Sequence, residues 1–457
     1  MSDRLFFKGT LILTFTGLAS RLMGFFYRIF LSHTIGAQGV GVFQLTLPVH
    51  TIVLAASCMG IQAAISRLCA SFTALGKEKK ARDSLLLGIF LSMGLSGFLS
   101  LLVYVNADFT ASVLLKEPRT ATLLRILAFS FPLSALHSCI NSFYYARKKT
   151  WIPAFILLLE QTSRIGSTYV IYLVLMSRQQ EITPMIAAGG ALFSELVAAS
   201  ACLLALALDF SRENYHPVSH FFLHLKNKKG HPALSIQKHS YVSLVKELSR
   251  IAVPHSANKL LLTSLSGIEM VLIPQRLLLS GISQADSLSI YGIFTGMALP
   301  LILFPATITN SASVMLMPSV AGLQALGHEK RIRFVIRRTC ESCFFFGAFC
   351  TLFFFIFGKN LGIFLFHNDT AGVYIKTLAF ICPFLYTNTA LESILNGLGR
   401  PDACLLHNVA GVCIRIGFVL FSIPQLGIRG YFYGMLVSQL ILSVLHFIYL
   451  IRMEISD

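Results

Sequence analysis

The sequence is poor in charged residues, which make up only 12% of its 457 positions. A soluble chain is about one-quarter charged, so the usual reading of this length as two or three soluble domains is excluded. The sequence also lacks a phosphate-binding loop, a GxSxG nucleophile elbow and an HExxH zinc motif. No ATPase or hydrolase site is therefore evident, and we expect a protein that is not an enzyme.

Hydrophobic residues, in contrast, make up 55% of the chain, and phenylalanine alone occurs 38 times. This low polarity excludes an intrinsically disordered protein, and the length excludes a small disulfide-stapled module. The apolar stretches are continuous and do not alternate with the two-residue period of a membrane barrel. The sequence therefore predicts an all-α, polytopic integral membrane protein.

Long uncharged intervals define the predicted membrane helices. No charged residue occurs between Asp83 and Asp108, or between Arg429 and Arg452. Each interval exceeds the roughly 20 apolar residues that cross a bilayer. The complete pattern predicts about twelve transmembrane helices, at 9–31, 40–66, 84–106, 120–145, 151–175, 184–208, 249–273, 288–317, 340–358, 372–395, 403–423 and 428–450.

The net charge of +17 is distributed asymmetrically across the predicted loops. Most Lys and Arg fall on the side of the N-terminus, whereas the opposite side holds only Lys116, Arg119, Arg178, Arg276, Lys359 and Arg429. Positive loops stay in the cytoplasm, so we expect both termini to be cytoplasmic. This distribution explains the positive charge without nucleic acid, and a basic inner surface suits anionic lipid headgroups.

An internal repeat divides the chain into two halves. ALGKEKKAR at 74–82 returns as ALGHEKRIR at 325–333. The same offset relates Pro132 to Pro383 and Arg164 to Arg415, and Pro48 matches Pro300 one residue further on. We predict two six-helix lobes, at 1–209 and 249–457, joined by a cytoplasmic linker at 210–248.

Six helices are an even number, so both lobes begin on the same side and form parallel repeats around a central cavity. Rocking of two such lobes exposes the cavity to each side in turn, which favours a transporter. The matched prolines Pro48, Pro132, Pro300 and Pro383 interrupt their helices, and we expect static kinks or hinges there.

Ionisable side chains at membrane depth usually face a wet cavity or a partner, because each costs roughly 2.5–3.5 kcal/mol to insert. The predicted helices contain five such cations, Arg21, Arg28, Arg164, Lys259 and Arg415. Arg21 and Arg28 share a helix face because they are two turns apart. A ladder of cations at graded depth suits an anionic ligand such as a diphosphate, and we expect these five residues to bind substrate.

The carboxylates at membrane depth allow two interpretations. Glu160 lies one turn before Arg164 and can pair with it, which weakens the case for substrate binding by Arg164. Glu195 and Glu269 are candidates for binding a coupling proton or cation, and equally for salt bridges to the arginines. We expect no metal and no cofactor: His216, His220 and His224 are spaced by four, but Pro217 interrupts them and no carboxylate completes the set.

The segment SRLMGFFYRIFLSHTIGAQGVGVFQLTLPVH at 20–50 resembles the opening of the stage V sporulation protein B group. This group belongs to the polysaccharide transporter branch of the multidrug/oligosaccharidyl-lipid/polysaccharide exporter superfamily, which also contains the lipid II flippases of peptidoglycan synthesis. The resemblance extends through ALGKEKKAR and LNGLGRPD at 395–402. The Ser-Arg…Gly…Arg pattern of the flippases falls on Ser20, Arg21, Gly24 and Arg28.

The resemblance implies a flippase of the bacterial cytoplasmic membrane that moves a polyprenyl-linked oligosaccharide such as lipid II by alternating access. It implies a cationic cavity for the diphosphate, movement without ATP, and a role beside cell-wall synthesis proteins. Many relatives carry two further C-terminal helices for the lipid tail, which do not follow helix twelve here. Two alternatives stay open: a multidrug and toxin extrusion-type cation antiporter, and a non-transporting scaffold for envelope assembly.

Overall fold

The computed structural model describes residues 2–212, 232–326 and 328–456, and within these ranges the regular elements are helices. The middle of the predicted linker, 213–231, therefore lies outside the described residues, as does the histidine cluster at 216–224. On either side of that gap, α9 ends at Arg212 and α11 begins at Pro232. The predicted boundaries of the lobes stay predictions.

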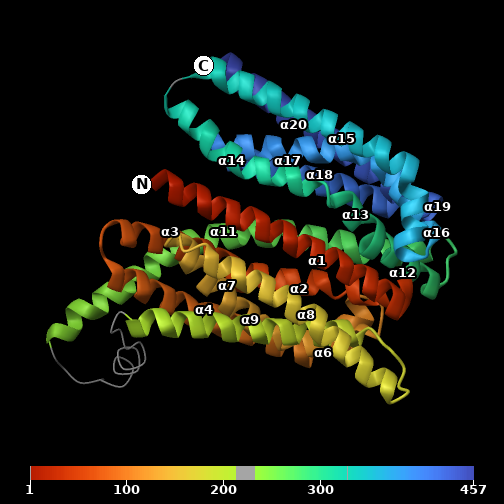
Figure 1. Cartoon of the computed structure of the whole chain (residues 1–457), viewed down its shortest axis with the longest axis horizontal. Coiled ribbons are helices and arrows are strands. Elements are labelled where there is room, and N and C mark those ends of the chain that lie inside the picture. The colour runs from red at the N-terminus through yellow and green to blue at the C-terminus, as the bar shows by residue number, and fades with distance from the viewer. Residues whose placement is uncertain (1, 213–231, 327, 457) are drawn as a thin grey trace.

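The first half of the chain forms a layer of helices in the lower part of Figure 1. Its elements are α1 (Ser2–Gln44), α2 (Leu47–Leu54), η1 (Ala55–Met59), α3 (Gly60–Ala74), α4 (Glu78–Val105), α5 (Ala107–Phe109), η2 (Thr110–Leu114), α6 (Thr120–Ala128), α7 (Ser130–Ala146), α8 (Trp151–Ser177) and α9 (Met185–Arg212). α1 runs along the upper side of this layer, facing the second half.

The second half forms the upper layer, while its first helix, α11, packs against α3 of the first half. Its elements are α11 (Pro232–Leu278), α12 (Gln284–Gly292), η3 (Ile293–Ala298), α13 (Leu299–Leu303), α14 (Ala306–Ala325), α15 (Glu329–Phe366), α16 (Asp369–Leu378), η4 (Ala379–Ile381), α17 (Cys382–Gly397), α18 (Pro401–Phe421), α19 (Ile423–Leu426) and α20 (Ile428–Ser456). Both termini lie at one end of the molecule, here called the terminal end (Figure 1).

Nine helices of the described residues are long and apolar enough to cross a membrane, and the bent pair α6–α7 makes a tenth candidate. α1 and α8 occupy the two remaining predicted spans, and both carry charged residues at membrane depth. The prediction of an all-α membrane protein with about twelve spans in two lobes is confirmed. Several helices are longer than predicted, because polar residues continue α1, α11 and α15 beyond the apolar segment.

Each of the four repeated prolines lies in the first turn of a helix that follows a break. Pro48 is the second residue of α2, Pro300 is the second residue after the π-helical segment η3, and Pro383 is the second residue after the 3-10 turn η4. Pro132 is the third residue of α7, which bends by 42° from α6. Proline fits the first turn of a helix because backbone N–H groups there have no partner within the helix, so the N–H that proline lacks is not missed. The spans are thus interrupted at these prolines; movement about them stays a prediction.

The two lobes share one hydrophobic core at the end opposite the termini. Leu45 and Leu124 of the first lobe and Phe294 and Phe432 of the second belong to this single buried cluster. Toward the terminal end the lobes have separate cores: one joins α3, α4, α7 and α9 with α11, and the other lies within α14, α15, α17 and α20. The layers accordingly diverge toward the terminal end (Figure 1).

Backbone contact between α1 and α12 closes the shared end. A Cβ atom added at Gly292 would lie 2.0 Å from the Ala37 carbonyl oxygen, and one at Gly41 would lie 2.1 Å from the Leu288 carbonyl oxygen. Only glycine allows two helices to approach so closely. The first residue of α12, Gln284, also donates a hydrogen bond to the Lys116 carbonyl oxygen between η2 and α6, at 3.2 Å. The structure is therefore closed at the end opposite the termini.

Candidate functional site

Two adjoining cavities lie between the lobes beside α1. The first, of about 360 Å³, is lined by Arg21, Gly24 and Arg28 from α1 and faces the Pro300–Asn310 region of the second lobe. The second, of about 450 Å³, is lined by Arg28 and Pro48 from the first lobe and by Lys259 and Pro300 from the second. Arg28 and Pro300 line both cavities. Three of the five predicted cations thus meet at one central site.

The regular spacing of α1 places these cationic side chains on one face. Arg21, Gly24 and Arg28 are three and four residues apart, so they follow each other along the helix. Gly24 has no atom within 4 Å of the position of a Cβ, which leaves room between the two guanidinium groups. Arg21 Nη1 donates a hydrogen bond to Thr307 Oγ1 of the second lobe at 2.8 Å. One cation of the site therefore already bridges the two lobes.

The central site has no negative charge of its own. The residues that line the two cavities include no Asp or Glu. Within the described parts of the chain, no carboxylate lies within ion-pair distance of Arg21, Arg28 or Lys259. The remaining polar lining consists of neutral groups, among them Gln44, Thr51, Thr263, Ser266 and Asn310. Sequence reasoning missed these side chains because neutral polar residues are common in membrane helices.

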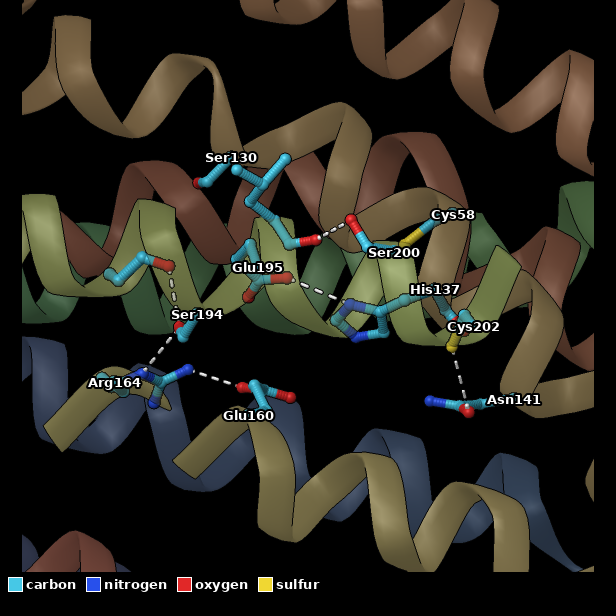
Figure 2. A network of polar contacts seen from close by, with 12 residues as sticks. Cys58, Ser130, His137, Asn141, Glu160, Arg164, Ser194, Glu195, Ser200 and Cys202 are labelled. Carbon is cyan, nitrogen blue, oxygen red and sulfur yellow. Dashed lines mark hydrogen bonds and ion pairs between the residues drawn. The ribbon is translucent and has the colours of Figure 1, made fainter. Parts of the chain in front are cut away.

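The other two predicted cations are neutralised by carboxylates. Arg164 of α8 donates to Glu160 Oε1 at 2.6 Å and to Ser194 Oγ of α9 at 3.3 Å (Figure 2). Arg415 of α18 forms a two-point contact with Glu269 of α11, at 2.6 and 3.1 Å. Neither arginine is among the residues that line the two central cavities. Their predicted depth is similar to that of Arg21, but packing turns them toward carboxylate partners.

Glu195 has a histidine partner in place of an arginine. His137 Nδ1 of α7 lies 3.1 Å from Glu195 Oε2, and both side chains are largely buried (Figure 2). Among the described residues Glu195 forms no ion pair with an arginine. Sequence reasoning missed His137, although a histidine inside a predicted membrane helix was visible. The first lobe thus holds a buried histidine–glutamate pair, which can gain or lose one proton.

Removal of the Glu269 carboxylate is expected to destabilise the second lobe strongly. The Glu269 side chain is only 3% exposed and also accepts a hydrogen bond from Tyr431 Oη at 2.7 Å. Glu269→Leu leaves the Arg415 charge buried and unpaired, which costs about 3–5 kcal/mol. The double variant Glu269→Leu/Arg415→Leu should recover much of this loss. Thermal unfolding in detergent measures both, and equal destabilisation by the single and double variants would contradict the pairing.

Comparisons with known proteins agree with this architecture. The family model MatE matches residues 13–170. Stage V sporulation protein B of Bacillus subtilis is 24% identical over 449 residues, which cover 98% of this chain and 83% of the relative. Lipid II flippase MurJ of the same organism is 23% identical over 445 residues, covering 91% of this chain and 77% of the relative.

Solved structures show the same fold. An inward-facing multidrug resistance MATE family transporter of the MOP superfamily aligns with a TM-score of 0.69 at 15% identity, covering 96% of this chain and 94% of that one. A MOP superfamily transporter from Pyrococcus furiosus aligns with a TM-score of 0.65 at 15% identity, covering 98% and 96%. The chain thus has the fold of the multidrug/oligosaccharidyl-lipid/polysaccharide exporter superfamily, and it resembles the stage V sporulation protein B and lipid II flippase group.

Proposed function

We propose that this protein is a flippase that moves a polyprenyl-diphosphate-linked sugar, similar to lipid II, across the bacterial cytoplasmic membrane. The observation that carries the proposal is the set of unpaired cations at the central cavities. Arg21, Arg28 and Lys259 face a shared space between two lobes, and no carboxylate of the described residues lines it. Such a site stabilises a compact anion and repels a cation.

A diphosphate fits the chemistry of this site. Each guanidinium group presents a planar fork that can bond two phosphate oxygens, and the Lys259 ammonium group adds a point charge from the opposite lobe. Because Arg28 belongs to the first lobe and Lys259 to the second, a bound diphosphate would link the two lobes. The ligand would then favour the conformations in which both groups reach it, which is the differential affinity that alternating access requires.

Arg164 and Arg415 contribute less in this proposal. Each matches the other in the internal repeat, and each is already satisfied by a glutamate. They hold helices together within their lobes and add to the positive potential from a distance. Glu195 has no arginine partner among the described residues, so it is our candidate for a coupling proton or cation, with His137 beside it.

The relatives support this choice of substrate and membrane. Two of them are named for sporulation and one for flipping lipid II, all in Bacillus subtilis. We therefore place the terminal end in the cytoplasm, as the distribution of Lys and Arg predicts. Cell-wall synthesis proteins are the expected partners. A cation antiporter is disfavoured because three cations and no carboxylate line the cavities, and a scaffold would leave these charges without a purpose.

Transport by the purified protein in proteoliposomes tests the proposal. We expect it to move a fluorescent polyprenyl-diphosphate sugar from one leaflet to the other and to leave an organic cation such as ethidium where it was added. Movement of a different polyprenyl-diphosphate sugar in place of lipid II would keep the class and change the sugar. Transport of the organic cation alone would support the antiporter and contradict the proposal.

A further inference from the structure

A third cavity, of about 730 Å³, lies at the terminal end, outside the central site. It is bordered by Arg67 and Ser71 of α3, by Arg250 and His255 of α11, and by Pro401 at the start of α18. α3 belongs to the first lobe and α18 to the second, so this cavity also lies between the lobes. We name it the mouth site.

α11 lines the mouth site with one face and the central cavity with another. Arg250, Pro254 and Asn258 are spaced by four residues and border the mouth site. Lys259, Thr263 and Ser266 continue along the helix and border the central cavity. Nine residues separate Arg250 from Lys259, which is about 14 Å along a helix. Nine residues are also about two and a half turns, so Arg250 and Lys259 project from opposite sides of α11.

The packing of α11 fixes which of its sides faces the mouth site. A Cβ atom added at Gly60 would lie 2.1 Å from Ser256 Oγ and 2.3 Å from the Ala252 carbonyl oxygen. The start of α3 is thus in direct contact with one side of α11. Residues on the other side, including Arg250 and Asn258, are exposed and turned toward the cavity. Rotation of Arg250 and Asn258 away from the mouth site would break the contact at Gly60.

The mouth site is net positive and suited to a phosphate group. Arg67 and Arg250 are exposed and have no ion-pair partner among the carboxylates of the described residues. Glu247 borders the same space and offsets one of the two charges, which leaves one net positive charge. Ser71 and Asn258 supply neutral donors. Leu68, Ile251 and Pro254 give the site an apolar border, as expected of a place that admits a lipid headgroup.

We propose that the mouth site binds the phosphate group of a lipid that enters from the leaflet at the terminal end, before the lipid moves on to the central cavity. The proposal rests on the proposed function for the hand-over to the central cavity, but binding at the mouth site is separate from it. In this order of events Arg67 and Arg250 capture the anion, and the central cations bind it for movement across the membrane. Loss of Arg67 and Arg250 should weaken binding of the lipid at the mouth site and leave binding at the central site unchanged.

Photo-crosslinking of the full-length protein in phosphatidylcholine nanodiscs locates the lipid. A benzophenone amino acid at Ser71 reports on the mouth site and one at Thr263 on the central cavity, with a radiolabelled polyprenyl diphosphate as the probe. We expect crosslinking at both positions. Arg67→Ala/Arg250→Ala should lower crosslinking at Ser71 at least about 10-fold, whereas Arg28→Ala should lower it only at Thr263. The control Lys79→Ala/Lys80→Ala removes two charges outside the site and should change neither.

The outcomes separate the sources of the phosphate and the two proposals. Crosslinking at Ser71 that survives excess phosphatidylglycerol supports the transported lipid as occupant. Its loss, together with crosslinking of phosphatidylglycerol itself, supports a phospholipid headgroup at the same site. Crosslinking at Ser71 without any at Thr263 in the wild type would contradict the proposed function and leave the mouth site in place. Equal crosslinking at Ser71 in the Arg67→Ala/Arg250→Ala variant and the control would overturn the mouth site.

Discussion

Arg28→Ala should reduce the initial rate of lipid flipping at least about 30-fold. Arg28 lines both central cavities, so its guanidinium group is the cation that a ligand would contact in either of them. A hydrogen bond to a charged group contributes about 2 kcal/mol, which corresponds to this factor. The rate is measured in proteoliposomes as the loss of accessibility of a labelled polyprenyl-diphosphate sugar.

Three further variants make the result specific to the site. Arg28→Lys keeps the charge but loses the planar fork, so its rate should fall between those of the wild type and Arg28→Ala. Arg21→Ala also breaks the hydrogen bond to Thr307, and Thr307→Ala distinguishes that contact from the loss of charge. Arg178→Ala removes an exposed arginine at the end of α8 and should behave as the wild type. A normal rate in folded Arg28→Ala would remove Arg28 from the binding site.

Gly292→Val should abolish transport for a mechanical reason. The added side chain would collide with the carbonyl oxygen of Ala37 and the backbone of Gly41, so α12 could not close against α1. The end opposite the termini would then stay open, and the protein could not alternate between its two states. We expect the transport rate to fall more than about 10-fold, in line with the 1–3 kcal/mol or more that overpacking costs at a tight contact.

Hydrogen–deuterium exchange shows where the effect lies. Exchange should increase in α12 and in the last two turns of α1, because their contact protects both backbones. Gly94→Val is the matched control, since Gly94 lies in α4 with no atom within 4 Å of a Cβ position. Unchanged exchange at α12 in Gly292→Val, with normal transport, would show that this contact does not gate the cavity.

The sequence was sufficient for the fold class because hydropathy and the internal repeat act over long segments. It could not show where helices break: α1 is kinked at Gly36, whose φ of 67° is not helical, and continues beyond the kink to Gln44. The sequence also predicted that the four prolines interrupt their helices. It could not predict that each proline lies in the first turn of a new helix, because that position depends on where the preceding helix ends.

The candidate site was predicted only in part, for a similar reason. Arg21, Arg28, Arg164 and Arg415 all occupy membrane helices, but depth along a helix does not say which neighbour a side chain meets. Arg164 forms an ion pair with Glu160 of its own helix, which the four-residue spacing already indicated. Arg415 pairs with Glu269 of α11, which is distant in the sequence, so only the packing of the helices shows this ion pair. The same holds for His137 beside Glu195.

Direct binding of lipids that differ only in charge tests the central claim, that unpaired cations between the lobes recognise a diphosphate. The measurement compares a polyprenyl diphosphate, the monophosphate and the uncharged polyprenol of equal chain length on the wild type and on Arg21→Gln/Arg28→Gln/Lys259→Gln. We expect affinity to decrease in that order for the wild type and to be nearly equal for the variant. Equal affinities for all three lipids in the wild type, or an unchanged preference in the folded variant, would contradict the account.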